Sequence, residues 1–217
     1  MARRKLRRRR RADEVETREL VLDEAERLIG AGGYDALRLK DIAEAVGIRI
    51  PSIYGHYEGR AGVLRGIAQR YVVLLADQFP YDGDTDPTKV LVEGVRKFVH
   101  MWAAHPAYTR MRLRDLEAPA GIPELDWAVA GPAEENAKHG PLAPFFARLQ
   151  RILDDGYEQG HFRRMGFIRL YRDILGATLG ALTYPNQRVL QGKASTAEVE
   201  EIAREIEDLV LRLVRPD

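Results

Sequence analysis

The residues best suited to a chemical task lie in the segment 40–57, where basic, hydroxyl and aromatic side chains accompany two short helical patterns. Apolar residues recur at helical spacing over 42–46, and Gly47 can end this first helix because glycine readily adopts a positive φ. Pro51 is tolerated in a helix only in its first turn, so it indicates where the second helix begins. Two short helices joined by a turn of about three or four residues are typical of the helix-turn-helix, whose second helix enters the DNA major groove. The segment therefore predicts DNA binding.

The second helix and its flanks offer side chains that can contact DNA. Arg49 comes directly before this helix, so its long side chain can reach a guanine edge or a phosphate. On a helix that begins at 49–51, the groove-facing candidates are Ile50, Ser52, Tyr54 and His56. Two of them have simpler interpretations, since Ser52 could serve only to begin the helix and His56 could be an ordinary surface histidine.

Further helical patterns must hold this pair in place. One apolar face of a first helix consists of Val21, Ala25, Leu28 and Ile29. We expect Ile53 and Tyr57 to point into the core that this face helps to form. A helix over about 59–77 carries apolar residues at helical spacing and is long enough to leave a small N-terminal domain and join a larger one. The turn-rich acidic segment 81–87 follows it.

These elements occur together in the order of a known family. The helix 21–29, the segment 33–36 and the run 41–60 resemble the N-terminal domain of TetR-type transcriptional regulators, over roughly residues 17–70. The resemblance implies an all-α protein with an N-terminal three-helix helix-turn-helix DNA-binding domain, which we place at 17–65. A larger C-terminal helical bundle over 66–217 would sense a ligand and form a homodimer.

The resemblance also implies roles on DNA. The Tyr54 hydroxyl would meet a backbone phosphate, Lys40 would reach a base edge, and Arg60 would hold a phosphate where the family usually has lysine. The complete set of expected DNA-contact residues is Arg38, Lys40, Arg49, Ile50, Pro51, Ser52, Tyr54, His56 and Arg60. Arg38 and Gly59 depart from the family, because each stands where a Ser or Thr usually caps a helix. Glycine in place of a serine cap should cost only a few tenths of a kcal/mol.

Positive charge is concentrated at the N-terminus. The chain has a net charge of +1, but residues 1–11 hold seven arginines, one lysine and no acid, so the other 206 residues carry a net charge of −7. A block of like charges repels itself, which predicts a disordered basic arm over 1–16. Such arms follow phosphates or enter a minor groove, although this one could be a solvated tail that only aids solubility.

The middle of the chain concentrates aromatic and methionine side chains, and no strand pattern follows residue 87. Apolar walls with a few polar groups suit a small-molecule cavity, and the resemblance favours one here. The expected ligand-binding residues are Trp102, His105, Tyr108, Met111, Trp127 and Phe146. Taken singly, each of them is better explained as an ordinary core residue.

The last two long helical patterns indicate self-association. Residues 166–184 and 195–213 each have an apolar face wider than one neighbouring helix would cover, and Gly176 and Gly180 allow a close approach. The combination predicts a four-helix bundle between two copies, with Leu179 and Ile206 in the interface. Packing within one chain is the alternative.

Other functions have no support in the sequence. The absence of cysteine excludes disulfides and thiolate metal sites and fits a reducing cytosol. The longest uncharged run, 174–187, has 14 residues, fewer than the roughly 20 that span a bilayer. The sequence contains no hydrolase elbow, zinc-protease motif or phosphate loop, and its five histidines lack metal-ligand spacing. We therefore expect neither a membrane protein nor an enzyme, and no cofactor.

The resulting functional prediction is a cytoplasmic, ligand-responsive repressor that binds a palindromic DNA operator as a homodimer. The alternative is a constitutive or architectural DNA binder without a small-molecule ligand. An architectural binder would depend on the arginine-rich segment and would lose its DNA when salt is raised.

Overall fold

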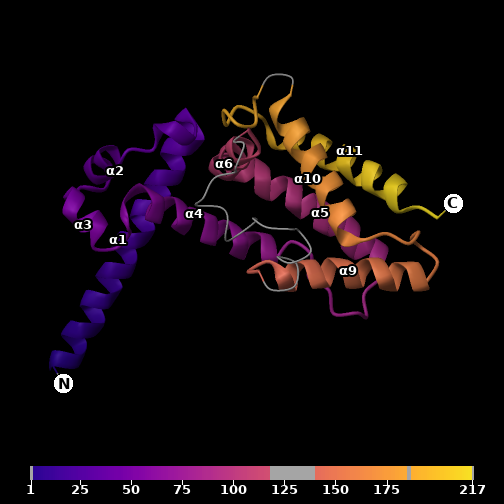
Figure 1. The fold of residues 1–217 in the computed structure, drawn as a ribbon, viewed down its shortest axis with the longest axis horizontal. Coiled ribbons are helices and arrows are strands. Elements are labelled where there is room, and N and C mark those ends of the chain that lie inside the picture. The colour runs from indigo at the N-terminus through magenta and orange to yellow at the C-terminus, as the bar shows by residue number, and fades with distance from the viewer. Residues whose placement is uncertain (1, 118–139, 185–186, 217) are drawn as a thin grey trace.

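The structure, a computed structural model, describes residues 2–117, 140–184 and 187–216, and all regular secondary structure in these ranges is helical. In chain order the elements are α1 (Ala2–Gly32), the 3₁₀ turn η1 (Tyr34–Ala36), α2 (Leu39–Val46), α3 (Ile50–Tyr54), α4 (Gly59–Ala76), α5 (Pro87–Ala104), α6 (Pro106–Glu117), α9 (Ala143–Glu158), α10 (Phe167–Thr183) and α11 (Thr196–Val214). Helices α2 and α3 lie beside α1 at one end of the molecule, and α5, α10 and α11 form the other end (Figure 1). The all-α prediction, with a small N-terminal domain and a larger helical body, is confirmed.

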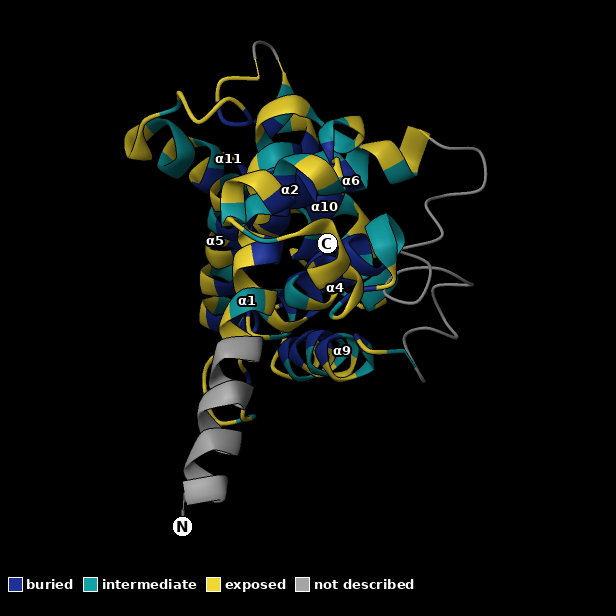
Figure 2. Ribbon diagram, turned by 90° about the vertical axis from the view of Figure 1, so that its left-hand side faces the viewer, coloured by how far each residue is buried: buried dark blue, intermediate teal, exposed yellow. Residues whose placement is uncertain are grey.

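The small domain closes around one apolar cluster. α1 contributes Val21, Ala25 and Ile29, α2 contributes Ile42 and Ala43, α3 contributes Ile53, and α4 contributes Val63, Leu64 and Ile67; all of them are buried. Tyr57 is also buried, and its hydroxyl donates a hydrogen bond to the Arg18 carbonyl at 3.0 Å. The predicted core roles of Ile53 and Tyr57 are confirmed. In Figure 2, buried stretches in dark blue alternate with exposed stretches in yellow along the helices.

Helix α1 begins much earlier than predicted. Where a disordered arm was expected over 1–16, the structure has helix from Ala2 onward, continuous with the core-forming turns of 21–29. Starting a helix is the costly step, whereas adding residues to an existing one costs little. Arginine is also a good helix former, so the chain can extend the packed helix towards its N-terminus.

Helix α4 belongs to both parts of the molecule, as predicted. Its first half packs in the small domain, while the ring of Tyr71 in its second half lies 5.1 Å from the ring of Trp102 on α5. The proposed domain boundary at residue 65 therefore falls inside a continuous helix. A movement of the body that displaces the second half of α4 would reach the small domain directly.

The larger body is arranged around α5, which contacts α6, α9, α10 and α11. Local capping fixes where its helices begin. Asp86 accepts a hydrogen bond from the Thr88 amide at the start of α5, and Ser195 and Glu198 form a capping box at the start of α11. Within the described residues, no helix combines the length and apolarity that crossing a bilayer requires.

Candidate nucleic-acid interface

Helices α2 and α3 are joined by the tight turn that the sequence predicts. Gly47 ends α2 with φ 74° and ψ 28°, and the Ile48 amide donates to the Ala43 carbonyl at 2.9 Å. This left-handed conformation is what favours glycine at the position. α3 carries Pro51 in its first turn and ends at Tyr54, so His56, expected on this helix, lies beyond its end. A tighter turn follows, in which the His56 amide donates to the Ile53 carbonyl at 2.9 Å.

Seven of the nine predicted DNA-contact residues lie exposed on one small part of the surface. They are Arg38, Lys40, Arg49, Ile50, Pro51, Ser52 and Tyr54. Buried Ile53 packs α3 against the core, so the opposite side of this helix faces solvent. Tyr54 is 61% exposed. Exposed apolar surface at a short helix is often a binding site. His56 is half-buried, so its position does not separate a DNA contact from a surface role.

The basic side chains of this surface are available for a ligand. In the described part of the chain, Arg38, Lys40 and Arg49 make no ion pair, whereas Arg65 on the adjoining helix is paired with Glu58 at 2.6 Å. Unpaired cations beside a protruding helix can neutralise phosphates without first breaking an internal pair. The arrangement thus suits a polyanion.

The two predicted departures in helix capping have different outcomes. Arg38 precedes α2 in an extended conformation, and its side chain makes no capping hydrogen bond. Gly59, expected to be a slightly weakened cap, has φ +64°. The structure corrects our view of this residue, because L side chains rarely adopt this conformation. Glycine here serves the backbone geometry between α3 and α4.

Gly59→Ala should therefore destabilise the protein by about 1 kcal/mol, the approximate cost of forcing a Cβ into the left-handed region. Space is not the obstacle, since a Cβ at Gly59 would meet only Tyr54 Cε1 at 3.5 Å. Urea unfolding measures the change. The matched control is Gly30→Ala inside α1, where the nearest atoms are 3.7 Å away. Equal stability of the Gly59 variant and wild type would refute the strain argument.

Arg60 is placed differently from the sequence prediction. Its guanidinium lies over the Tyr34 ring at 4.5 Å and donates to the carbonyls of Tyr34 at 2.9 Å and Leu37 at 3.3 Å. The side chain is half-buried against the segment before α2. A phosphate contact from Arg60 would have to use the N–H groups that these partners leave free.

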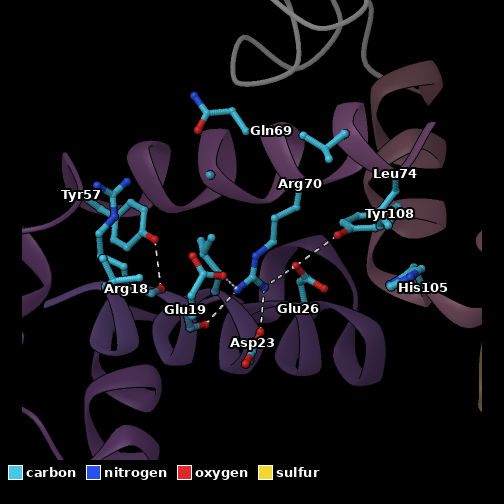
Figure 3. Close-up of a pocket in the computed structure, with 14 residues that line it drawn as sticks. Arg18, Glu19, Asp23, Glu26, Tyr57, Gln69, Arg70, Leu74, His105 and Tyr108 are labelled. Atoms are coloured by element: carbon cyan, nitrogen blue, oxygen red, sulfur yellow. Dashed lines mark hydrogen bonds and ion pairs between the residues drawn. The ribbon is translucent and has the colours of Figure 1, made fainter. Parts of the chain in front are cut away.

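A groove of about 640 Å³ separates α1 from α4 and continues to α6 (Figure 3). Arg70 on α4 crosses it to α1, where it pairs with Glu19, with Asp23 at 2.7 Å and with Glu26 at 2.9 Å. Glu26 also accepts a hydrogen bond from the Tyr108 hydroxyl of α6 at 3.2 Å. The Glu26 carboxylate on α1 thereby connects the small N-terminal domain to α4 and to α6 of the larger body.

The Arg70 cluster was not identified from the sequence. Glu19, Asp23 and Glu26 do form an acidic stripe at helical spacing on α1, which is a detectable signal. Their common partner lies between 44 and 51 residues further along the chain. Only the packing of α4 on α1 brings it to the stripe.

The predicted ligand-binding residues mostly occupy core positions. Trp102, Tyr108 and Met111 are buried, and Trp102 packs against Tyr71 and Phe98 with ring distances of 5.1 and 5.9 Å. Half-buried Phe146 lies elsewhere in the same aromatic cluster, and Trp127 lies outside the described residues. Trp102, Tyr108 and Met111 thus pack as ordinary core residues, which was the alternative interpretation of these side chains.

His105 stacks on Tyr108 at 4.9 Å and lines the groove of Figure 3. Burial lowers the pKa of His105, while the nearby Glu26 carboxylate acts in the opposite direction. Burial also raises the pKa of the Tyr108 hydroxyl, with the Glu26 charge adding to the effect. Both shifts favour the neutral forms of these side chains, whose observed contacts are ring stacking and the Tyr108 hydrogen bond to Glu26.

Trp102 Nε1 and Thr178 Oγ1 are among the polar atoms of the body that are buried without a hydrogen-bond partner in the described residues. An unpaired buried donor costs about 1–3 kcal/mol. Both residues are fully buried. Such groups are suited to a polar atom of a bound molecule or an internal water.

Helices α10 and α11 leave exposed the two glycines predicted for close helix approach, but not the two apolar residues predicted to share the interface with them. Leu179 and Ile206 are only 4% and 3% exposed, so they belong to the core of a single chain and cannot form the surface of an interface. The exposed positions are Gly176 and Gly180, where an added Cβ would meet nothing within 4 Å, together with Leu209 on α11 and Tyr184, which is 82% exposed. The small residues therefore face outward while the leucine between them faces inward.

Sequence similarity to known proteins is found in the N-terminal part of the chain. Residues 21–67 match the model of the family described as "Bacterial regulatory proteins, tetR family". The chain is 34% identical over 55 residues to the HTH-type transcriptional repressor ComR of Escherichia coli (strain K12), a match that spans 25% of this chain and 26% of that protein. Likeness in sequence to this relative thus covers about a quarter of each protein.

Comparisons of structure extend over nearly the whole chain. The TetR family transcriptional regulator PfmR from Thermus thermophilus is 21% identical, with a TM-score of 0.62 and coverage of 91% of this chain and 96% of that one. FadR from Bacillus subtilis, solved in complex with stearoyl-CoA, is 15% identical, with a TM-score of 0.66 and coverage of 91% and 99%. The ketosteroid transcriptional regulator KstR2 of Mycobacterium tuberculosis is 16% identical, with a TM-score of 0.64 and coverage of 92% and 95%. These likenesses, all below 25% identity, show that the chain shares the fold of these regulators.

Proposed function

We propose that this chain, which its N-terminal domain and its fold identify as a TetR-type transcriptional regulator, is a ligand-responsive repressor that binds a palindromic operator as a homodimer. The observation that carries the proposal is the exposed surface of α2 and α3, where unpaired cations flank a short helix with outward-facing Ile50, Ser52 and Tyr54. A recognition helix of five residues can place only a few side chains on base edges.

The contacts divide into two classes. Tyr54 and Ser52 hold phosphates and set the position of the domain on the duplex, while Lys40 and Arg49 reach base edges. All four side chains are exposed, so none has to leave a core position to reach DNA.

The division of roles is testable by mutation. Tyr54→Ala should weaken binding to all duplexes alike, whereas Lys40→Ala and Arg49→Ala should weaken binding by roughly 10-fold and also change the preferred base at the positions they contact. Competitive selection from a randomised duplex library measures both effects. If the Lys40 and Arg49 variants kept the parental base preference at every position, these residues would not read bases.

A homodimer through α10 and α11 supplies the symmetry that a palindrome requires. The exposed glycines of α10 permit close helix approach, and Tyr184 after α10 and Leu209 on α11 add exposed apolar surface. Two reading domains related by a two-fold axis can occupy half-sites about one DNA turn apart, roughly 34–36 Å between centres. Repression then depends on the separation of the two domains.

An effector would act on that separation through the aromatic core and the Arg70 cluster. Tyr71 contacts both Trp102 and Tyr108, and the Tyr108 hydroxyl is bonded to Glu26 on α1. A molecule that binds one arrangement of these rings more tightly than another shifts the position of α1 and α4. The bound stearoyl-CoA of FadR and the ketosteroid in the name of KstR2 suggest an apolar effector with a polar group. Unpaired Trp102 Nε1 and Thr178 Oγ1 are candidate partners for that group.

Tryptophan emission tests this part of the proposal. The chain has two tryptophans, so Trp127→Phe leaves Trp102 as the single reporter. Long-chain acyl-CoA and steroid probes are expected to change the Trp102 emission and to release a bound duplex over the same concentration range. A panel of such probes that changes neither signal would favour the alternative, a constitutive DNA binder.

A further inference from the structure

The segment between α1 and α2 is held by one side chain from α4. Gly33 has φ 88°, η1 follows at Tyr34–Ala36, Leu37 is buried, and Arg38 directly precedes α2. Neither η1 nor α2 has a side-chain cap at its start. The start of α2, with Lys40 in its first turn, depends on other contacts.

Arg60 provides those contacts. Its Nε–H donates to the Leu37 carbonyl, one terminal N–H donates to the Tyr34 carbonyl, and the other terminal nitrogen lies 3.4 Å from the Tyr34 hydroxyl. The guanidinium plane also covers the Tyr34 ring, with its carbon 4.5 Å from the ring centre. Two carbonyls and one ring thus bind the same planar group, which a lysine ammonium cannot imitate because it lacks the planar fork.

We propose that Arg60 is a positioning residue for base reading: it sets the start of α2, and through it the direction of Lys40, instead of serving as a phosphate ligand. This deepens the proposed function and rests on it, since base reading by Lys40 is part of that proposal. The lysine usual at this position in the family would bind a phosphate as a point charge. The Arg60 guanidinium instead binds two carbonyls and a ring of its own domain.

The first experiment compares Arg60→Ala and Arg60→Lys in selection from a randomised duplex library. A positioning role predicts that both variants change base preference at the positions that Lys40→Ala changes, and that Arg60→Ala combined with Lys40→Ala changes them no further. Rescue by Arg60→Lys would overturn the proposal, because lysine keeps a phosphate contact but loses the fork. Unaltered base preference in Arg60→Ala would overturn it as well.

The second experiment measures the salt dependence of binding to a duplex of mixed sequence. Loss of one phosphate contact lowers the slope of log K against log salt by about 0.9, so a positioning role predicts an unchanged slope for Arg60→Ala together with roughly 10-fold weaker binding to the selected duplex. Arg65→Ala is the matched control, an exposed arginine on the same helix whose removal changes the net charge equally. A slope reduced only in the Arg60 variant would identify a phosphate ligand and refute the proposal.

The third experiment needs no DNA and separates the inference from the proposed function. Amide exchange of residues 39–42 should be at least several-fold faster in Arg60→Ala and Arg60→Lys than in wild type and in Arg65→Ala, since two amides of this turn donate to the Arg38 carbonyl. Unchanged exchange would exclude the positioning role even if the protein binds DNA. Failure of the wild-type protein to bind any duplex would refute the proposed function and with it base reading by Lys40.

Discussion

Gly180→Glu is expected to yield monomers and to weaken operator binding about 100-fold, because the protein would lose simultaneous engagement of two half-sites. Gly180 lies on the exposed face of α10, and a Cβ there meets no other atom of the chain. The folded protomer therefore accommodates the side chain, and glutamate is a better helix former than glycine. In a two-fold interface the new carboxylates would be desolvated close to the partner helix. Sedimentation and duplex titration measure the two effects.

The choice of this position follows from the burial of its neighbour. Leu179→Glu would place a charge in the core of a single chain, and any loss of dimers could then reflect unfolding. Ala147→Glu adds the same charge at an exposed site on α9 and serves as the control. A Gly180→Glu protein that still sediments as a dimer would place the interface elsewhere.

Arg70→Met should destabilise the protein by about 2 kcal/mol, between the cost of breaking an exposed pair and that of breaking a buried one. Methionine preserves most of the apolar stem but leaves Glu19, Asp23 and Glu26 close together without their common cation. The contact between α1 and α4 would loosen, so operator affinity should fall even for the protein that remains folded. Urea unfolding and duplex titration of the same samples provide the measurements.

Arg65→Met is the matched control for this change. Arg65 lies on the same helix and pairs with an exposed partner, Glu58, whose loss should cost less than about 1 kcal/mol. Equal effects of the two substitutions would show that the three carboxylates gain nothing from Arg70. The Tyr108–Glu26 hydrogen bond would then be the remaining polar link from the body to this stripe of α1.

Short-range sequence features determined the helix-turn-helix of the small N-terminal domain. Gly47, Pro51 and the apolar spacing of α2 each restrict a few neighbouring dihedral angles, and those restrictions act whatever the rest of the chain does. The capping box at Ser195 is local in the same way. The helix-turn-helix, the all-helical fold and the exposure of Tyr54 were therefore predictable, and the resemblance to TetR-type regulators followed from the order of these local signals.

Sequence alone could not determine which side of each apolar stripe would be covered. Leu179 and Gly180 are neighbours on α10, yet one is buried and the other faces solvent, because the crossing of α10 with α5 and α11 decides the orientation. The extent of α1 was missed for a related reason. Repulsion in the basic segment was visible in the sequence, but the support that a packed helix gives to its own extension was not.

Partners distant in the chain were decided by tertiary structure alone. The resemblance implied a phosphate contact for Arg60, where the family usually has lysine; its carbonyl partners, 23 and 26 residues earlier, could not be predicted from that match. Arg70 finds its carboxylates across a helix contact that no spacing rule describes. A sequence lists the charges of a protein, whereas pairing depends on distances of a few ångströms that exist only after the helices have packed. The local signals thus determined the helix-turn-helix, and the packing decided which arginines bind partners inside the chain and which stay exposed on its surface.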